Sequence, residues 1–571
     1  MNGFSVLFRK RRDISFISNG DNKRKIEEED FIAYNNMIPK FENDKIFYNN
    51  QQYLLILDGI ILNKEKLIND NENWTAYLID EYKKSDLFFN ELRGSFSGVI
   101  YDKEKKKIIV FSDQIGSKFL FYYVNDEIIF VSSQMQEVYS FLKQNNIQYS
   151  LSVENAYLIL SYGFTIEDRT ICNKIKKLEP GSYLIRESEQ EKMVQKDYYL
   201  IDNEPDYTIT EDDAIELLDT EFCRAIKLEF DHDINNGYKT HFVSLSGGLD
   251  SRMVCWVAHQ LGYVNQVNFT FSQTNYLDES IPQQISSDLK HEWIFKSLDS
   301  GTWLKNIDEV TKESGGNVLY YTLGHELSLN KYINMQNFGT IHSGQLGDAI
   351  FGASLAKSKN QNDKFELGDG AYSTRYLSKI DGLQLHRNYK NVEIANLYYR
   401  GFSGANGCCV CTNSYNEMVS PFTNIDLMEN TLKIPIKMRY KHYIYKKWIL
   451  SKYPKAADYI WEKSGTKIGR KFGIIRYGTH EVPIEQIWRK IQYKYFGKKA
   501  ENDNKSMNPY GYYMDTNSDL SNYLMNYFKS NMYCVSDKNL SNLLTDIMNS
   551  NNHMEMIQAL SVISASKIFF E

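Results

Sequence analysis

The stretch Ser246-Gly247-Gly248-Leu249-Asp250-Ser251 decides the fold of the larger part of this chain. It stands between a short apolar run at residues 241–245 and an amphipathic run at residues 250–261, which predict a strand and a helix. Two adjacent glycines let the backbone wrap closely round an anion, to which serine hydroxyls and helix-start amides donate hydrogen bonds. A carboxylate at the helix start would repel a bare phosphate, so it indicates a bridging Mg²⁺. The alternative is an ordinary capped glycine turn. A Walker A loop is excluded because Gly-Lys-Ser/Thr is absent.

The pattern continues as strand and helix beyond this loop. Residues 267–271 read as a second strand and residues 280–289 as another helix. Such alternation predicts a parallel α/β sheet whose ligand site lies at the carboxyl ends of the strands. The tail from about residue 440 reads as helical, aromatic and rich in lysine.

Residues 1 to about 195 follow a different pattern. Short β-branched and aromatic runs, separated by polar or glycine-containing turns, predict an antiparallel layered sheet. These runs are residues 96–101, 107–111, 119–123 and 127–131. Residues 202–207 read as an acidic linker, and Thr210 with Asp213 has capping-box spacing before a helix through Ala225. We therefore expect one domain over residues 1–200 and a second over residues 208–571.

Composition narrows the classes of protein. Of the 571 residues, 42% are hydrophobic and 24% charged, which is typical of a soluble globular protein. The net charge of −7 argues against a basic nucleic-acid-binding coat. No apolar run is long enough to span a membrane, and there is no signal-peptide pattern. Seven scattered cysteines indicate reduced thiols and a cytoplasmic protein. Three of them cluster at residues 408–411, without the second Cys/His pair of a zinc site.

Three motifs of the second domain carry a resemblance to a known family. The loop at residues 246–251 resembles the pyrophosphate loop (PP-loop) of the N-type ATP pyrophosphatases. The stretch SGQLGDAIFG at residues 343–352 follows a predicted strand at 338–342, and it is similar to the SG-E-G-x-D-E-x-F-G motif of the asparagine synthetases. Residues 417–424, EMVSPFTN, are similar to their E-x-R-x-P-F-L-D.

The first domain carries the same resemblance, so that it runs from residue 1 to about 470. LRGSF at 92–96, SDQIGSK at 112–118, IKKLEPG at 175–181 and DGIILN at 58–63 look like motifs of the family's glutaminase domain. The resemblance implies an α+β, Ntn-hydrolase-like layered antiparallel sheet of the class II amidotransferase type. An α/β parallel-sheet PP-loop domain with a helical C-terminal part is expected to follow it.

The resemblance also implies ATP and Mg²⁺ as cofactors. The positions that match the family's ATP site are Ser244, Leu245, Ser246, Gly247, Gly248, Asp250, Ser251, Phe271, Ser343 and Gly344. Asp250 and Asp348 match its acidic Mg²⁺ positions. A catalytic lysine should stabilise the leaving pyrophosphate. Lys467 is the first choice and Lys463 the second, against the alternative of a solvated helical face.

Three departures from the family bear on activity. Glutamine-using members begin Met-Cys-Gly-Ile, whereas this chain begins Met1-Asn2-Gly3-Phe4, and an amide cannot act as the glutaminase nucleophile. The family's Asn-Gly-Glu becomes Asp58-Gly59-Ile60. Gln345 replaces a glutamate implicated in handling ammonia, and it has no useful acid–base pKa. The β-lactam synthetases and lasso-peptide cyclases are similar in lacking a working first domain.

We therefore expect an AMP- and pyrophosphate-forming ligase that adenylates a small-molecule or peptide carboxylate and passes the acyl group to an amine or ammonia, without glutamine. The alternatives are an ammonia-dependent asparagine synthase, a tRNA-acting PP-loop protein and a non-catalytic scaffold. No membrane partner is expected, and helical spacing of the tyrosines near residues 440–459 favours packing over RNA stacking. A homodimer is one possible oligomeric state that the sequence leaves open.

Overall fold

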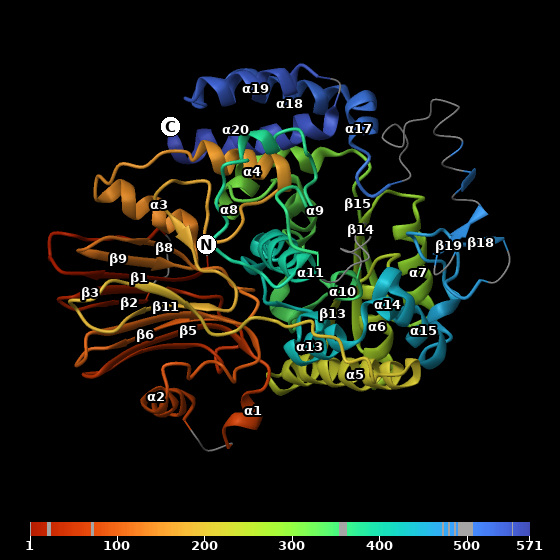
Figure 1. The fold of residues 1–571 in the computed structure, drawn as a ribbon, viewed down its shortest axis with the longest axis horizontal. Helices are drawn as coiled ribbons and strands as arrows, with labels where there is room; N and C mark the ends of the chain where they lie inside the picture. Colours follow the sequence, from red (N-terminus) through yellow and green to blue (C-terminus); the bar gives the residue numbers. More distant parts are fainter. Residues whose placement is uncertain are drawn as a thin grey trace.

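The computed structural model describes residues 2–19, 24–69, 73–352, 363–470, 473–477, 480–484, 487–488, 491, 506–550 and 552–571. Figure 1 shows layered sheets from the first part of the chain on the left and a helix-covered sheet from the later part on the right. The antiparallel sheets end at Asp197, and helix α5 (Glu211–Asn235) opens the second part. The capping box of Thr210 and Asp213 starts this helix, which runs ten residues beyond the predicted end at Ala225.

The first part consists of two six-stranded antiparallel sheets that bury a shared core between them. Helix α2 (Trp74–Lys84) covers the outer face of one sheet, and α3 (Met135–Gln144) and α4 (Val153–Tyr162) cover the other. The predicted class of this domain is confirmed as a four-layer α/β/β/α arrangement. The spatial order of the first sheet is β10 (Lys176–Lys177), β8 (Phe121–Val124), β9 (Ile128–Ser132), β1 (Gly3–Arg9), β3 (Phe31–Asn36), β2 (Arg24–Glu27). The spatial order of the second sheet is β12 (Val194–Asp197), β11 (Ser182–Arg186), β7 (Lys107–Ser112), β6 (Gly94–Asp102), β5 (Tyr53–Ile61), β4 (Ile46–Asn49).

Strand β1 shows why this sequence makes layers. Phe4, Val6 and Phe8 face the core between the sheets, while Leu7 faces the core under α3 and α4. Successive side chains of a strand point to opposite faces, so a strand that is apolar on both faces must be covered on both. All seven residues of β1 are buried.

The second part is built on a five-stranded parallel sheet, as predicted. Its spatial order is β15 (Glu292–Ser297), β14 (Gln266–Ser272), β13 (His241–Ser244), β16 (Ile341–His342), β17 (Met418–Val419). The chain leaves β13 toward β14 and β15 through α6 (Asp250–Gln260) and α7 (Leu277–Leu289), and returns on the other side of β13. The strand order therefore reverses between β13 and β16, where open α/β sheets place their ligand crevice. Strand β16 covers only the last two of the predicted residues 338–342, and the backbone oxygens of Phe338 and Gly339 accept from Lys40 of the first domain.

The C-terminal part is helical, as expected, and returns to the first domain. It comprises α17 (Tyr510–Thr516), α18 (Ser518–Asn531), α19 (Lys538–Met548) and α20 (His553–Phe570). Helix α20 lies against α4 and against α8 (Ile307–Ser314), and the Phe569 ring stacks on Tyr139 with centroids 4.3 Å apart. A hairpin of β18 (Ile474–Tyr477) and β19 (His480–Pro483) interrupts the helices and was not predicted.

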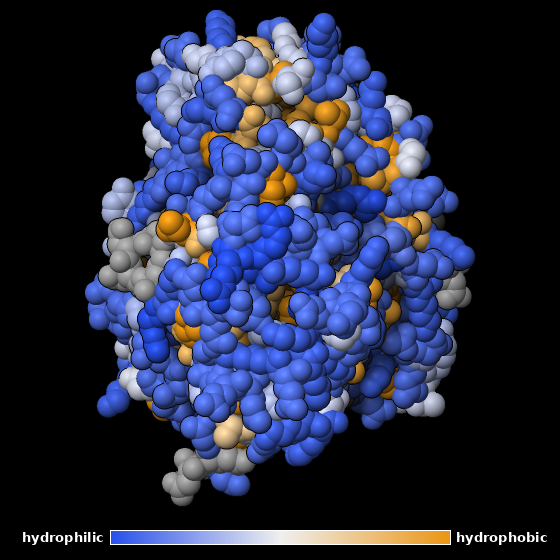
Figure 2. Space-filling model, turned by 90° about the vertical axis from the view of Figure 1, so that its left-hand side faces the viewer, coloured by the Kyte–Doolittle hydropathy of each residue, from blue (hydrophilic) through white to orange (hydrophobic). Residues whose placement is uncertain are grey.

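Among the described residues, none of the helices combines the length and the apolar character needed to cross a bilayer. Figure 2 views the side of the molecule that carries the first domain. This face is mostly hydrophilic, with hydrophobic side chains in small separate groups.

Candidate active site

The glycine loop lies at the carboxyl end of β13, at the reversal of strand order. Strand β13 ends at Ser244 and helix α6 begins at Asp250, so the loop occupies the turn that the sequence predicts. The Ser246 amide donates to the Ser251 hydroxyl (2.9 Å). The Gly247 amide donates to the carboxylate of Asp278 at 2.7 Å. A carboxylate thus already occupies one amide of the predicted phosphate loop.

The second motif packs directly on the first, and glycine makes this approach feasible. A Cβ on Gly344 would lie 2.4 Å from the Ser251 amide nitrogen, and one on Gly347 would lie 2.4 Å from Cγ of Asp250. The Asp348 amide donates to Asp250 Oδ2 at 3.0 Å. Two loops almost one hundred residues apart are therefore brought into contact at the end of the sheet.

The two predicted metal ligands form an acidic pair. The enclosed position of Asp250 and the neighbouring charge of Asp348 raise the pKa of Asp250 to about 7, while the charge of Lys463 acts in the opposite direction. A divalent cation stabilises the charged form of a buried carboxylate such as Asp250. Oxygen donors at this edge of the sheet fit Mg²⁺.

A cavity of about 610 Å³ opens beside this pair. Six of the predicted site residues line it: Ser244, Phe271, Ser343, Gln345, Asp348 and Lys463. The other predicted ATP-site residues lie in the two loops or at the strand end and are not part of its wall. The first domain contributes Gly163 and Phe164, so both domains enclose the cavity.

The two candidate lysines lie in different surroundings. Lys463 lines the cavity and acts electrostatically on Asp250. Lys467 is 55% exposed and pairs with Asp458 at 3.3 Å on the surface. Lys463 is also exposed, but of the two lysines it alone forms part of the cavity wall.

Gln345 is held on three sides. Its carbonyl oxygen accepts from the Cys409 thiol at 3.1 Å, its amide group donates to Asn406 (3.4 Å), and its backbone oxygen accepts from Ser420 (2.8 Å). These bonds fix the side chain as a neutral part of the cavity wall. Cys408 and Cys409, which the sequence left without a role, also line this cavity as free thiols.

The region of the first domain that corresponds to the family's glutaminase site is occupied by buried charges. Lys118 lies 2.9 Å from Glu417 and 3.5 Å from Asp58, and Lys45 lies 3.1 Å from Glu417. Although burial opposes it, the two lysines lower the pKa of Glu417 to about 2. Asn2 beside this cluster donates to the Ser414 backbone oxygen at 2.7 Å. We call Lys45, Asp58, Lys118 and Glu417 the interdomain charge cluster. Met1 lies outside the described residues.

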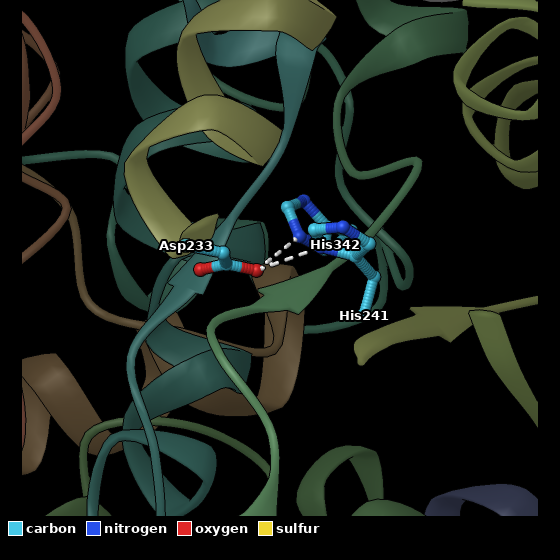
Figure 3. Close-up of side chains that lie close together, drawn as sticks. All are labelled: Asp233, His241 and His342. Carbon is cyan, nitrogen blue, oxygen red and sulfur yellow. Dashed lines mark hydrogen bonds and ion pairs between the residues drawn. The ribbon is translucent and has the colours of Figure 1, made fainter. Parts of the chain in front are cut away.

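A second buried cluster lies between helix α5 and strands β13 and β16 (Figure 3). Asp233 near the end of α5 accepts from His342 Nε2 at 2.8 Å and pairs with His241 Nδ1 at 3.2 Å, and His342 Nδ1 faces Glu229 at 3.3 Å. The ligand atoms of Asp233, His241 and His342 lie within 4.8 Å of one another, as metal ligands would. Because Asp233 also accepts from the Thr340 amide, its bonds to protein groups account for both of its oxygens. The cluster thus joins α5 to β13 and β16.

Comparison with known proteins places this architecture. A glutamine amidotransferase domain is recognised over residues 44–199. The chain is 22% identical to asparagine synthetase (glutamine-hydrolyzing) 1 of Bacillus subtilis over 46% of this chain and 42% of that protein. It is 25% identical to a protein of Methanocaldococcus jannaschii named for asparagine synthetase (glutamine-hydrolyzing) 2, over 55% of this chain and 62% of the relative. It is 26% identical to amidase chry2 of Gibberella zeae, over 37% of this chain and 32% of that protein.

Each of these matches spans less than two thirds of the relative's length. Among solved structures, the chain is similar to glutamine phosphoribosylpyrophosphate (PRPP) amidotransferase from B. subtilis complexed with ADP and GMP. The match covers 52% of this chain and 85% of the other chain. The identity is 12% and the TM-score 0.24. Fold and site together define a two-domain protein with an amidotransferase-like first domain and a glycine-loop α/β second domain. Residues 44–199 match the glutamine amidotransferase domain family, and the chain is similar to asparagine synthetases over part of its length.

Proposed function

We propose that this protein is an ATP-dependent ligase that forms AMP and pyrophosphate, adenylates a carboxylate and transfers the acyl group to an amine without using glutamine. The observation that carries the proposal is the contact of the two glycine loops, which sets Asp250 and Asp348 side by side at the mouth of a 610 Å³ cavity. A scaffold without catalysis has no physical need for two repelling carboxylates at this edge of the sheet.

The residues would divide the work as follows. Asp250 and Asp348 would hold Mg²⁺, which when bound neutralises the departing pyrophosphate. The loop amides would hold phosphate oxygens. Asp278 must first release the Gly247 amide, and partial burial, which raises the pKa of Asp278 to about 6, lowers the cost of neutralising it. Lys463 would stabilise charge on the transferring phosphoryl group.

The interdomain charge cluster supports independence from glutamine. Asp58 replaces the family's asparagine and is 4% exposed between Lys118 and Lys45. The nearby pocket beside Asn2 holds only about 40 Å³, and the two lysines are committed to Asp58 and Glu417. A glutamine side chain would have to displace charges that are buried and paired, which is costly.

An ammonia-dependent asparagine synthase is the second candidate, because asparagine synthetases are among the relatives. The variant Gln345→Glu distinguishes the asparagine synthase from the proposed ligase. In an asparagine synthase it restores the family's residue and should raise asparagine formation from aspartate and ammonium chloride. In a ligase reshaped for another amine it should give no asparagine and lower the native rate, because it adds a carboxylate beside the pyrophosphate site. A clear gain of asparagine would reverse our ranking.

The proposal is tested by release of AMP and pyrophosphate from ATP and Mg²⁺ over a panel of carboxylates, including aspartate, β-amino acids, uronic acids and peptides. Hydroxylamine serves as a general trap for the acyl-adenylate. We expect one class of carboxylate to give stoichiometric AMP, pyrophosphate and hydroxamate with no glutamine present. Release of ADP, or a strict requirement for glutamine, would contradict the proposal.

A further inference from the structure

Glu326 is the second carboxylate in the cavity wall. The lining contains two carboxylates, Asp348 in the metal pair and Glu326 on helix α9 (Tyr321–Asn330). Thr322, one turn earlier on the same helix, also lines the cavity. Residues four apart share one face of a helix, so α9 presents this hydroxyl and this carboxylate to the same space.

Two adjacent cysteines connect this face of α9 to Gln345. The Cys408 thiol donates to the Thr322 hydroxyl at 3.3 Å, and the next residue, Cys409, donates to the Gln345 carbonyl oxygen at 3.1 Å. Both thiols feel the charge of Glu326, which together with burial raises their pKa. Glu326 is therefore close enough to both cysteines to raise the pKa of their thiols, and Cys409 in turn contacts Gln345, the position where the family carries its glutamate.

The other glutamates near Gln345 are already committed. Glu417 is 1% exposed and bound by Lys118 and Lys45. Glu229 is 2% exposed and faces His342. In contrast, no described cation lies within ion-pair distance of Glu326, and its enclosed position raises its pKa, with Thr412 acting in the opposite direction. A partly enclosed carboxylate without a cationic partner favours a positive ligand and is a better base than an exposed one.

We propose that Glu326 binds the acceptor amine and takes its proton when the amine attacks the acyl-adenylate, an assignment that rests on the ligase function proposed above. The amine nitrogen forms a bond to the acyl carbon, and the bond from that carbon to the phosphate oxygen of AMP breaks. AMP leaves with the electron pair, and the proton lost by nitrogen passes to the Glu326 carboxylate. Gln345 would contribute only as a neutral neighbour.

The cavity lining also bears on the acceptor, which would reach Glu326 through the cavity. Phe164, Leu319 and Leu397 of the cavity wall provide apolar surface, and the space far exceeds the roughly 30 Å³ of a water-sized molecule. We therefore assign the acceptor to an organic amine, carried on the carboxylate substrate or on a second molecule.

The test compares two nucleophiles on one acyl-adenylate. Hydroxylamine is a weak base that is already unprotonated at neutral pH and needs no proton acceptor to attack, whereas ammonia and ethylamine do. With the carboxylate that supports pyrophosphate release in the wild type, Glu326→Gln should lower amide formation from ammonia or ethylamine by about 10²–10⁴-fold. Hydroxamate formation and pyrophosphate release should change by less than about threefold. Glu326→Asp should recover part of the loss.

Glu313→Gln is the matched control, because Glu313 lies on α8, accepts from Ser414 and is not part of the cavity wall. It should leave both products unchanged. Equal loss of amide and hydroxamate in Glu326→Gln, or loss of neither, would overturn the assignment while leaving the ligase proposal intact. A wild-type protein that releases no pyrophosphate with any carboxylate would instead overturn the ligase proposal, and this assignment with it.

Discussion

At the scale of single residues, the proposed function depends most on Asp250 and Asp348. Burial of Asp250, together with the neighbouring charge of Asp348, raises the pKa of Asp250, and a shared cation would stabilise both carboxylates in their charged form. Sequence motifs located both residues but gave no account of their contact, which depends on folding two distant loops together.

Asp250→Asn should therefore lower the rate of pyrophosphate release by about 10²–10³-fold, the usual cost of losing one electrostatic stabiliser. Stability should rise or stay unchanged, because the repulsion is removed. Asp231→Asn, on the exposed side of α5 where Asp231 accepts from Tyr263, is the control. Release by Asp250→Asn within about threefold of the wild type would contradict the metal assignment.

Other residues show why the sequence could not supply the whole site. Asp278 follows β14 by a few residues, and its place in the first turn of α7, at the ligand edge of the sheet, was the available signal. Glu326 gave no such signal, because it lies on an ordinary helix and reaches the cavity only through the packing of α9 against residues 408–412. Lys463 and Lys467 are equivalent in sequence, and only the fold separates a cavity wall from a surface ion pair.

At the scale of elements, the contact between the loop after β13 and the loop after β16 is the feature on which the site depends. Gly347→Ala places a methyl group 2.4 Å from Cγ of Asp250, so the loops must separate. The strain, typically about 1–3 kcal/mol, should weaken ATP·Mg²⁺ binding by about 10- to 100-fold in calorimetry.

The control is Gly382→Ala, since a Cβ at Gly382 meets nothing within 4 Å. It should leave ATP binding unchanged. Equal affinity of Gly347→Ala and the wild type would show that loop contact does not shape the nucleotide site.

The buried cluster between α5 and strands β13 and β16 makes the attachment of α5 dependent on pH. Burial lowers the pKa of His342, but the charge of Asp233 and the bonds to Asp233 and Glu229 outweigh it and raise this pKa to about 9. The resulting stabilisation is complete below the ordinary histidine pKa of 6.5 and is lost as pH rises toward 9. On the acid side, His342 and His241 hold the pKa of Asp233 well below its usual range despite burial, so that contribution persists until strongly acidic pH.

Denaturant unfolding should therefore show a wild-type advantage over His342→Gln that shrinks between pH 6.5 and 9. Linkage sets the size of this change at up to about 3 kcal/mol. Burial raises the pKa of Glu229 to about 7, so the titration of Glu229 also changes the free energy of unfolding, mainly below pH 7. Part of that change occurs in both the wild type and His342→Gln and cancels in the comparison. An advantage that is constant from pH 6.5 to 9 would mean that His342 is neutral in the folded protein.

The presence and type of the helices and strands were predicted better than their lengths. Strand and helix periodicity identified β13, α6, β14 and α7, because each has one buried face that repeats regularly along the chain. Strand β16 is only two residues long, since Phe338 and Gly339 stay outside the ladder and their backbone oxygens bind Lys40 of the first domain. Tertiary contacts of this kind leave no periodic trace in sequence.

At the scale of the whole molecule, the first domain serves as a fixed partner of the second. The interdomain charge cluster joins the domains through buried ion pairs, and Gly163 and Phe164 of the first domain form part of the cavity wall. Lys118→Met leaves Asp58 and Glu417 with Lys45 alone. Breaking a buried ion network in this way typically costs about 3–5 kcal/mol, so Tm should fall by several degrees.

The double variant Lys118→Met/Asp58→Asn restores the balance of charge and should recover part of this loss. Lys83→Met, which removes an exposed pair with Asp80, should change stability by no more than about 0.5 kcal/mol. A Tm for Lys118→Met equal to that of Lys83→Met would show that the cluster does not hold the domains together.

If a substrate carboxylate attacks the α-phosphorus of ATP, one oxygen of that carboxylate must pass to AMP, and oxygen-18 labelling detects this transfer. With a carboxylate labelled in both oxygens, hydroxylamine as acceptor and no glutamine, mass spectrometry of the products follows the label. The account predicts one oxygen-18 atom in the phosphate of AMP, none in pyrophosphate, and no glutamate when glutamine is added. Label in inorganic phosphate with ADP as the nucleotide product, or AMP without label, would contradict it.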